Sequence, residues 1–210
     1  MAANYQSVAF GEETKRLQEK YGSRSAYARV EKTSFYDGLS ENETAFIAER
    51  DGFYMASNGK DGFPYIQYRG GPAGFLKIID SQTIGFLDFS GNKQYISAGN
   101  LKVNDKVALI IMDYARKARL KIYARAEIVE LGADSALEHL LDLHGYKGKP
   151  ERIIKLRIEA YDWNCPQHIV QRFTIPEIED AFAAQKDYII ALKQEIESLK
   201  SKVEQLSKQG

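Results

Sequence analysis

The stretch LKIYARAEI, residues 120–128, alternates apolar side chains with polar or charged ones. The same period of two recurs in residues 154–161, IKLRIEAY. Because successive side chains of a strand point to opposite faces, both patterns predict strands with one dry face and one wet or ligand-facing side. Residues 107–112, VALIIM, are apolar throughout, which predicts a strand covered on both faces.

Shorter strand-like runs precede these. Residues 53–57 and 64–69 flank a turn at 58–62 that contains Asn and Gly, the pattern of a hairpin. Residues 75–80 and 83–88 form another pair joined by a short polar turn. Because most connections between the runs are short, we predict a mainly β fold with flanking helices, built as an antiparallel barrel rather than a parallel sheet.

The chain is predicted to have three parts. Residues 1–50 form a helical segment that packs on the barrel, and Ser40 and Glu43 have the spacing of a capping box at the start of one helix. Residues 51–173 form the barrel itself. Residues 174–210 form a long C-terminal helix.

The C-terminal helix has the pattern of a coiled coil. Its start is marked by Thr174, Pro176 and Glu177, which combine capping-box spacing with a proline in the first turn. Apolar residues then recur at alternating three- and four-residue steps over about two and a half heptads: Ile189, Leu192, Ile196, Leu199, Val203 and Leu206. The pattern predicts a helix that supports a homodimer or docks a partner; an amphipathic helix lying on its own barrel is the alternative.

Composition excludes several classes of protein. The 210 residues suit one domain with an appendage, and 29 basic residues balance 29 acidic ones, so we expect neither nucleic acid nor membrane as a partner. The single cysteine excludes a disulfide framework within one chain. Since no signal peptide and no apolar run of about 20 residues is present, we expect a cytoplasmic protein.

Common hydrolytic motifs are absent, and no metal site is expected. His139 and His144 are spaced five apart on a predicted helix, which is unfavourable for one shared face. Cys165 and His168 have the residue types of a nucleophile pair or of a structural corner. Residues 163–169, WNCPQHI, offer groups that stack on and hydrogen-bond to a heteroaromatic ring, although a rigid corner is the alternative.

Two stretches have the composition of a phosphate site. Residues 67–72, QYRGGP, and residues 89–94, FSGNKQ, each follow a strand-like run and combine glycine with a cation. Glycine lets the main chain approach a ligand closely, and a rigid sheet fixes the directions of Arg69, Lys77 and Lys93. This combination predicts a phosphate-bearing ligand.

Together these stretches resemble the pyridoxamine 5'-phosphate oxidase-like superfamily of FMN-binding split barrels, over about residues 43–172. The matching motifs are PYIQYRGGP (64–72), FLK (75–77), GNKQY (91–95) and WNCPQH (163–168). The resemblance implies an antiparallel split barrel, FMN as the cofactor, and a homodimer with its sites at the subunit interface.

The resemblance also implies which residues bind the FMN phosphate. Arg69 matches the family's strand arginine and Lys77 its strand lysine. Asn92, Lys93 and Gln94 would occupy the Ser-Arg-Lys run of the oxidases. Lysine in place of arginine gives up a bidentate contact, so the phosphate would be held differently here.

A second set of residues is implied for the flavin ring. Asp88 and Phe89, at the end of a strand, would lie beside the ring. Arg119, Trp163 and Gln167 would reach the cofactor of the other subunit. No catalytic side chain is assigned, because the flavin itself carries the redox chemistry.

The leading functional hypothesis is an FMN-dependent oxidoreductase that transfers hydride or electrons to an unidentified small-molecule substrate. Vitamin B6 oxidation is not expected, since the C-terminal helix replaces the oxidases' pattern for pyridoxal phosphate. The alternatives are a flavin or haem sensor or shuttle, in which haem would need an axial ligand such as His168, and a purely structural protein assembled through the coiled coil. Whether the redox partner is a nicotinamide or the deazaflavin F420 stays open.

Overall fold

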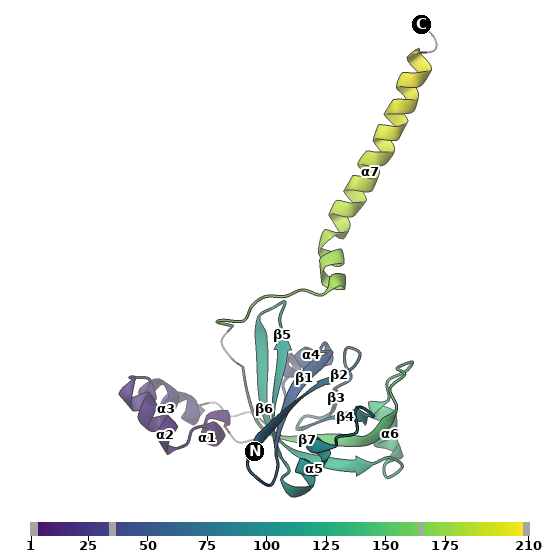
Figure 1. Cartoon of the computed structure of the whole chain (residues 1–210). Helices are drawn as coiled ribbons and strands as arrows, with labels where there is room; N and C mark the ends of the chain where they lie inside the picture. Colours follow the sequence, from purple (N-terminus) through teal and green to yellow (C-terminus); the bar gives the residue numbers. More distant parts are fainter. Residues whose placement is uncertain (1–3, 34–36, 164–165, 208–210) are drawn as a thin grey trace. The chain divides into compact units, whose positions relative to one another are not determined.

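The computed structural model describes residues 4–33, 37–163 and 166–207. It divides into two compact units, Met1–Ile169 and Val170–Gly210, which are described separately below. The first unit contains the sheet and six helices of the described residues, and the second contains one long helix (Figure 1).

Seven strands of the described residues form one antiparallel sheet in the order β2-β1-β5-β6-β7-β4-β3. The predicted antiparallel, mainly β fold is confirmed, and the sequence-based period of two appears in β6, where Leu120, Ile122 and Ala124 are buried. The strands are β1 (Gly52–Asn58), β2 (Pro64–Gly70), β3 (Lys77–Asp80), β4 (Thr83–Phe89), β5 (Lys106–Asp113), β6 (Ala118–Glu130) and β7 (Pro150–Trp163).

Strand β5, which lies between β1 and β6, differs from the prediction. Val107, Leu109 and Ile111 are buried, whereas the alternate residues Ala108 and Ile110 are only partly buried. The expectation of cover on both faces is therefore wrong for the single chain. One face of the sheet packs into the core, and the other keeps apolar side chains accessible.

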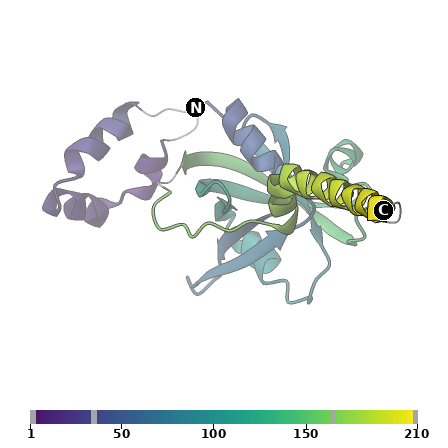
Figure 2. The same cartoon turned by 90° about the horizontal axis from the view of Figure 1, so that it is seen from above.

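The helices include one that was not predicted, α5, which follows the FSGNKQ stretch. Among the N-terminal helices, α3 contacts both α1 and α2, and α1 also contacts β7 (Figures 1 and 2). The helices are α1 (Tyr5–Ala9), α2 (Glu12–Lys20), α3 (Arg24–Thr33), α4 (Glu41–Ala48), α5 (Ile96–Val103), α6 (Ser135–Leu141) and α7 (Ile175–Ser207).

Helix α4 is attached to the barrel through the carboxylate of Glu43. The predicted capping box is present, with the Ser40 N–H donating to Glu43 at 3.0 Å. The same carboxylate accepts hydrogen bonds from Trp163 Nε1 at 2.5 Å and from the Tyr161 hydroxyl at 3.3 Å. Burial alone would raise the pKa of Glu43, but the hydrogen bonds from Ser40 and Trp163 outweigh it and hold the pKa below its usual value.

Replacing Glu43 by Gln should destabilise the barrel. At pH 7 we expect the free energy of unfolding to fall by about 1–2 kcal/mol, because a charge-assisted acceptor for Trp163 is lost. Urea unfolding followed by the fluorescence of Trp163, the single tryptophan, measures this. Glu41→Gln, in the same first turn but exposed, is the matched control and should leave the midpoint unchanged.

The pH dependence has a defined sign. Because the folded-state pKa of Glu43 is lowered, its contribution is complete above the unfolded pKa of about 4.3 and is lost as the pH falls through the folded-state pKa. The difference between wild type and Glu43→Gln should therefore shrink in acid. A difference that is the same at pH 7 and at low pH would contradict this role.

Candidate functional site

A cavity of about 210 Å³ lies where β2, β4, β7 and the segment leading into α5 meet. Most of its wall is polar. Its lining residues are Tyr65, Gln67 and Arg69 of β2, Asp88 and Phe89 of β4, residues 91–95, the first turn of α5 (Ile96, Ser97 and Ala98), and Glu151 and Arg152 of β7.

Asp88 forms the charged centre of the cavity wall. The residue is only 6% exposed, and its carboxylate lies between Arg69, at 2.5 Å, and Arg152, at 3.0 Å. Both arginine side chains are largely buried, and Arg69 Nε has no hydrogen-bond partner among the described residues. Four strands separate β2 from β4 in the sheet, so the Arg69–Asp88 ion pair joins parts of the sheet that are not hydrogen-bonded neighbours.

The segment after β4 has an unusual backbone. Lys93 and Tyr95 have φ angles of 61° and 53°, in the left-handed region that residues other than glycine seldom adopt. The Gln94 N–H donates to Asn92 Oδ1 at 3.2 Å, which stabilises the turn between them. Residues held in this region are enriched at ligand sites, so the strained backbone at the cavity is consistent with a binding role.

Helix α5 presents its N-terminal end to the same cavity. The first-turn N–H groups of Ile96, Ser97 and Ala98 have no acceptor within the helix, and the N-cap residue Tyr95 supplies no side-chain acceptor. The Ser97 hydroxyl donates to Gln67 Oε1 at 2.9 Å, which fixes the helix against β2. Because a helix N-terminus carries partial positive charge, this end of the cavity favours an anion.

The predicted site residues divide into two groups. Those that the structure brings together in the cavity are Arg69, Asp88, Phe89, Asn92, Lys93 and Gln94. Those that do not line it are Lys77, Arg119, Trp163 and Gln167. Lys77 begins β3, where it pairs with Gly85.

Three of the residues outside the cavity were expected to reach the cofactor of another subunit, which stays a prediction. Arg119 lies on β6 and has a buried Nε without a hydrogen-bond partner among the described residues. Trp163 packs edge-on against Phe46, with ring centroids 4.7 Å apart. Gln167 is exposed in a turn after β7.

Sequence reasoning missed Arg152 and the first turn of α5. A signal for Arg152 was present, because it shares the strand phase of Ile154 and Leu156, which are buried. A charged residue in the inward phase of a strand indicates a buried cation that must be paired. Nothing comparable marked the helix start, since the residue before it has no capping side chain.

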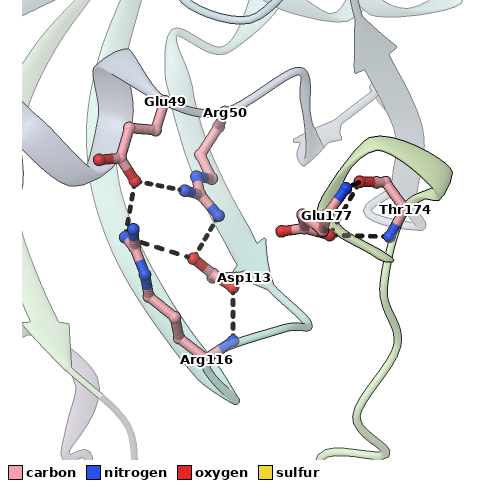
Figure 3. Close-up of polar contacts among 6 residues, drawn as sticks. All are labelled: Glu49, Arg50, Asp113, Arg116, Thr174 and Glu177. Carbon is pink, nitrogen blue, oxygen red and sulfur yellow. Dashed lines mark hydrogen bonds and ion pairs between the residues drawn. The ribbon is translucent and has the colours of Figure 1, made fainter. Parts of the chain in front are cut away.

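A second ionic cluster in the first unit has a structural role. Asp113 is buried and pairs with Arg50 at 2.5 Å, while Glu49 accepts hydrogen bonds from both Arg50 and Arg116 (Figure 3). The Arg116 and Arg50 guanidinium groups hold the pKa of Glu49 below its usual value. Two cations balance two carboxylates, so the cluster joins the end of α4 to the β5–β6 hairpin and leaves no net charge for a ligand.

The described residues provide no evidence for a Cys/His nucleophile pair, a metal site or a membrane-spanning helix. Cys165 lies outside the described residues, so its pairing with His168 is not described. Within the described ranges, no group of three or more His, Cys, Asp and Glu side chains could hold a metal ion. None of the described helices combines the length and apolar character required to cross a membrane.

A known protein family matches the middle of the chain. The family model, described as pyridoxamine 5'-phosphate oxidase, covers residues 39–162, from just before α4 to the end of β7. No curated protein matches the chain significantly.

Several solved structures are similar to this chain. A Clostridium acetobutylicum protein related to general stress protein 26, of the pyridoxinephosphate oxidase family, is 18% identical over 65% of this chain and 94% of its own, with a TM-score of 0.45. HupZ of Group A Streptococcus is 16% identical over 64% and 99%, with a TM-score of 0.49. An FMN-binding protein of Syntrophomonas wolfei is 14% identical over 70% and 97%, with a TM-score of 0.43.

Removing the central carboxylate should test the ionic wall of the cavity. Asp88→Asn leaves two largely buried arginines without their shared anion, and we expect the free energy of unfolding to fall by about 3 kcal/mol. Asp61→Asn, an exposed residue in the β1–β2 connection, is the control and should change little. Chemical denaturation measures both; equal midpoints for the two variants would show that Asp88 does not hold the strands together.

Proposed function

Because the chain belongs to the pyridoxamine 5'-phosphate oxidase family, as its motifs predicted, we propose that it is an FMN-dependent oxidoreductase. The cavity beside α5 would hold the phosphate of FMN. The observation that carries the proposal is the convergence of a helix N-terminus, a strained turn and the cation Lys93 on one polar cavity.

The residues present fit a phosphate. Arg69 and Arg152 are already paired with Asp88, whereas Lys93 has no ion-pair partner among the described residues. Lys93, together with the N–H groups of the first turn of α5, would supply a cation and several donors at the cavity mouth. A phosphate dianion is stabilised by this combination of charge and backbone donors.

The chain's own groups bind and orient the cofactor, and none is assigned as a nucleophile. Bound FMN would supply hydride or electron transfer. Arg69 would keep its position through Asp88, so that the phosphate site and the sheet form one rigid unit. The substrate class is a small molecule, and pyridoxamine phosphate itself is not the one proposed.

A second copy of the chain would complete each site. The cavity volume of about 210 Å³ is below the roughly 300–1,000 Å³ of typical ligand pockets, so it suits only the polar end of FMN. The outer face of the sheet carries exposed apolar side chains, including Tyr54, Ile66 and Tyr68. Burial of this face in a homodimer would cover them, and the unpartnered Nε of Arg119 would gain an acceptor.

The phosphate contact can be isolated by comparing FMN with riboflavin, which lacks the phosphate. We expect the wild type to bind FMN more tightly, and Lys93→Asn to weaken FMN binding about tenfold while changing riboflavin binding little. Asparagine is chosen because it tolerates the left-handed backbone at this position. Quenching of flavin fluorescence on titration gives both affinities.

Lys77→Gln is the matched control, because Lys77 carries the same charge outside the cavity. It should leave the FMN affinity unchanged. If Lys77→Gln weakened FMN binding and Lys93→Asn did not, the phosphate would be bound elsewhere. A protein that binds neither flavin would contradict the proposed function.

Turnover separates the enzyme from a flavin-binding sensor or shuttle, an alternative favoured by the exposed apolar seam of α7. Protein loaded with FMN should oxidise a reduced nicotinamide or reduced F420 in the presence of an electron acceptor, faster than free FMN does. Rates equal to those of free FMN with both donors would leave the binding module as the better description. A strong Soret band in the purified protein would instead indicate haem.

A further inference from the structure

Helix α7 leaves a continuous apolar seam accessible. The helix runs unbroken from Ile175 to Ser207 (Figures 1 and 2), about 50 Å in length. None of its described residues is buried. The seam residues are between 39% and 70% exposed. An apolar stripe of this length on a helix whose other faces are charged indicates a partner helix.

The seam is longer than the two and a half heptads found from the sequence. In heptad notation, Ile189, Ile196 and Val203 take position a. The same frame continues towards the N-terminus through Phe182 at a and Ile178 at d, both of which are exposed on α7. A seam of this length can bury enough apolar surface for a stable pair.

The residue types at the seam favour a particular number of helices. Position a is β-branched in the three C-terminal heptads, and position d is leucine, at Leu192, Leu199 and Leu206. Among parallel coiled coils, branched residues at a with leucine at d favour two helices over three or four.

The flanking charges favour a parallel pair. Position e is lysine in three successive heptads, at Lys186, Lys193 and Lys200, and Glu195 takes position g. In an antiparallel pair, the e positions of the two helices face each other and would bring lysines together. In a parallel pair, Glu195 faces Lys200 of the second copy, which gives two attractive pairs in the dimer.

We propose that α7 pairs with α7 of a second copy as a parallel, in-register, two-stranded coiled coil. The polar residue Gln185 occupies a d position, so only this register sets it opposite the same amide of the second copy. Any other register or direction would place that amide against apolar side chains. A buried polar residue of this kind specifies register at some cost in stability.

Parallel pairing has a consequence for the barrels. Residues 170–174 connect the first unit to α7 and span at most about 18 Å. Both barrels would be tethered at the same end of the coiled coil, which raises the concentration of each around the other to roughly the millimolar range. The proposed pairing of α7 does not depend on the proposed function. The idea that this pairing favours a site shared by two barrels does depend on it.

Disulfide formation in the full-length chain tests the direction. In a Cys165→Ser background, Leu206→Cys should form a disulfide-linked dimer readily, because a disulfide requires Cα atoms within about 7 Å. Ser201→Cys, at the outward-facing position f, is the control and should form the dimer at least tenfold more slowly. Mixing the Leu206→Cys and Phe182→Cys chains should give no disulfide between them.

Two other outcomes of this experiment would contradict the proposal. A disulfide that links the Leu206→Cys chain to the Phe182→Cys chain would show antiparallel pairing, in which position d faces position a. Equal rates for Leu206→Cys and Ser201→Cys would show that the helices do not pair through this seam. The assay needs no flavin, so its failure and a failure to bind FMN are distinguishable.

A charge exchange tests the register independently. Glu195→Lys should weaken α7 pairing roughly threefold to tenfold, since it sets lysine opposite Lys200 of the second copy, and adding Lys200→Glu should restore it. The loss of the helical circular dichroism signal on dilution of the full-length protein measures the pairing. If Lys200→Glu alone strengthened the pairing, the lysines would face one another in an antiparallel pair and the proposal would be wrong.

Discussion

The paired ionic contacts of Asp88 with Arg69 and Arg152 fix the geometry of the first unit. They connect β2, β4 and β7 across a sheet in which four other strands lie between β2 and β4. An unpaired buried charge destabilises a fold. Removing either arginine would leave part of the buried charge of this group unpaired. The same contact that closes the sheet therefore also positions one wall of the cavity, and the site cannot be separated from the fold.

Much of the fold could be predicted from local patterns. In a strand with one dry face, apolar residues recur at every second position. This period does not depend on which strands pair, so β6 and β7 could be predicted directly from the sequence. The placement of Lys77 depended instead on counting residues from a motif. The β3–β4 pairing shifts register between Ile78 and Asp80, an irregularity that residue counting cannot show. The predicted loop residues therefore line the candidate cavity, whereas Lys77 does not, and the role of each in binding stays a prediction.

A more general rule would have found the rest of the cavity wall. Gln67 and Arg69 share the inward phase of β2, Asp88 shares that of Phe86 in β4, and Arg152 shares that of Ile154 in β7. Polar residues in the inward phase of several strands indicate a polar interior at one end of a barrel. Helix α5 could not be found in this way, because it is not a strand and the residue before it has no capping side chain. Tertiary contacts, including the hydrogen bond from Ser97 to Gln67, hold it in place.

Three features of the two units, each with a different physical origin, support the proposal that two copies of the chain pair. The cavity is polar, and its volume of about 210 Å³ is below that of typical ligand pockets. The outer face of the sheet leaves Tyr68 and other apolar groups accessible, and α7 has an apolar seam whose charges suit a second copy. Because the helices would supply pairing free energy of their own, the barrel interface need not be large. A modest barrel interface, held by a tether, would leave the cofactor site open to exchange of its ligands.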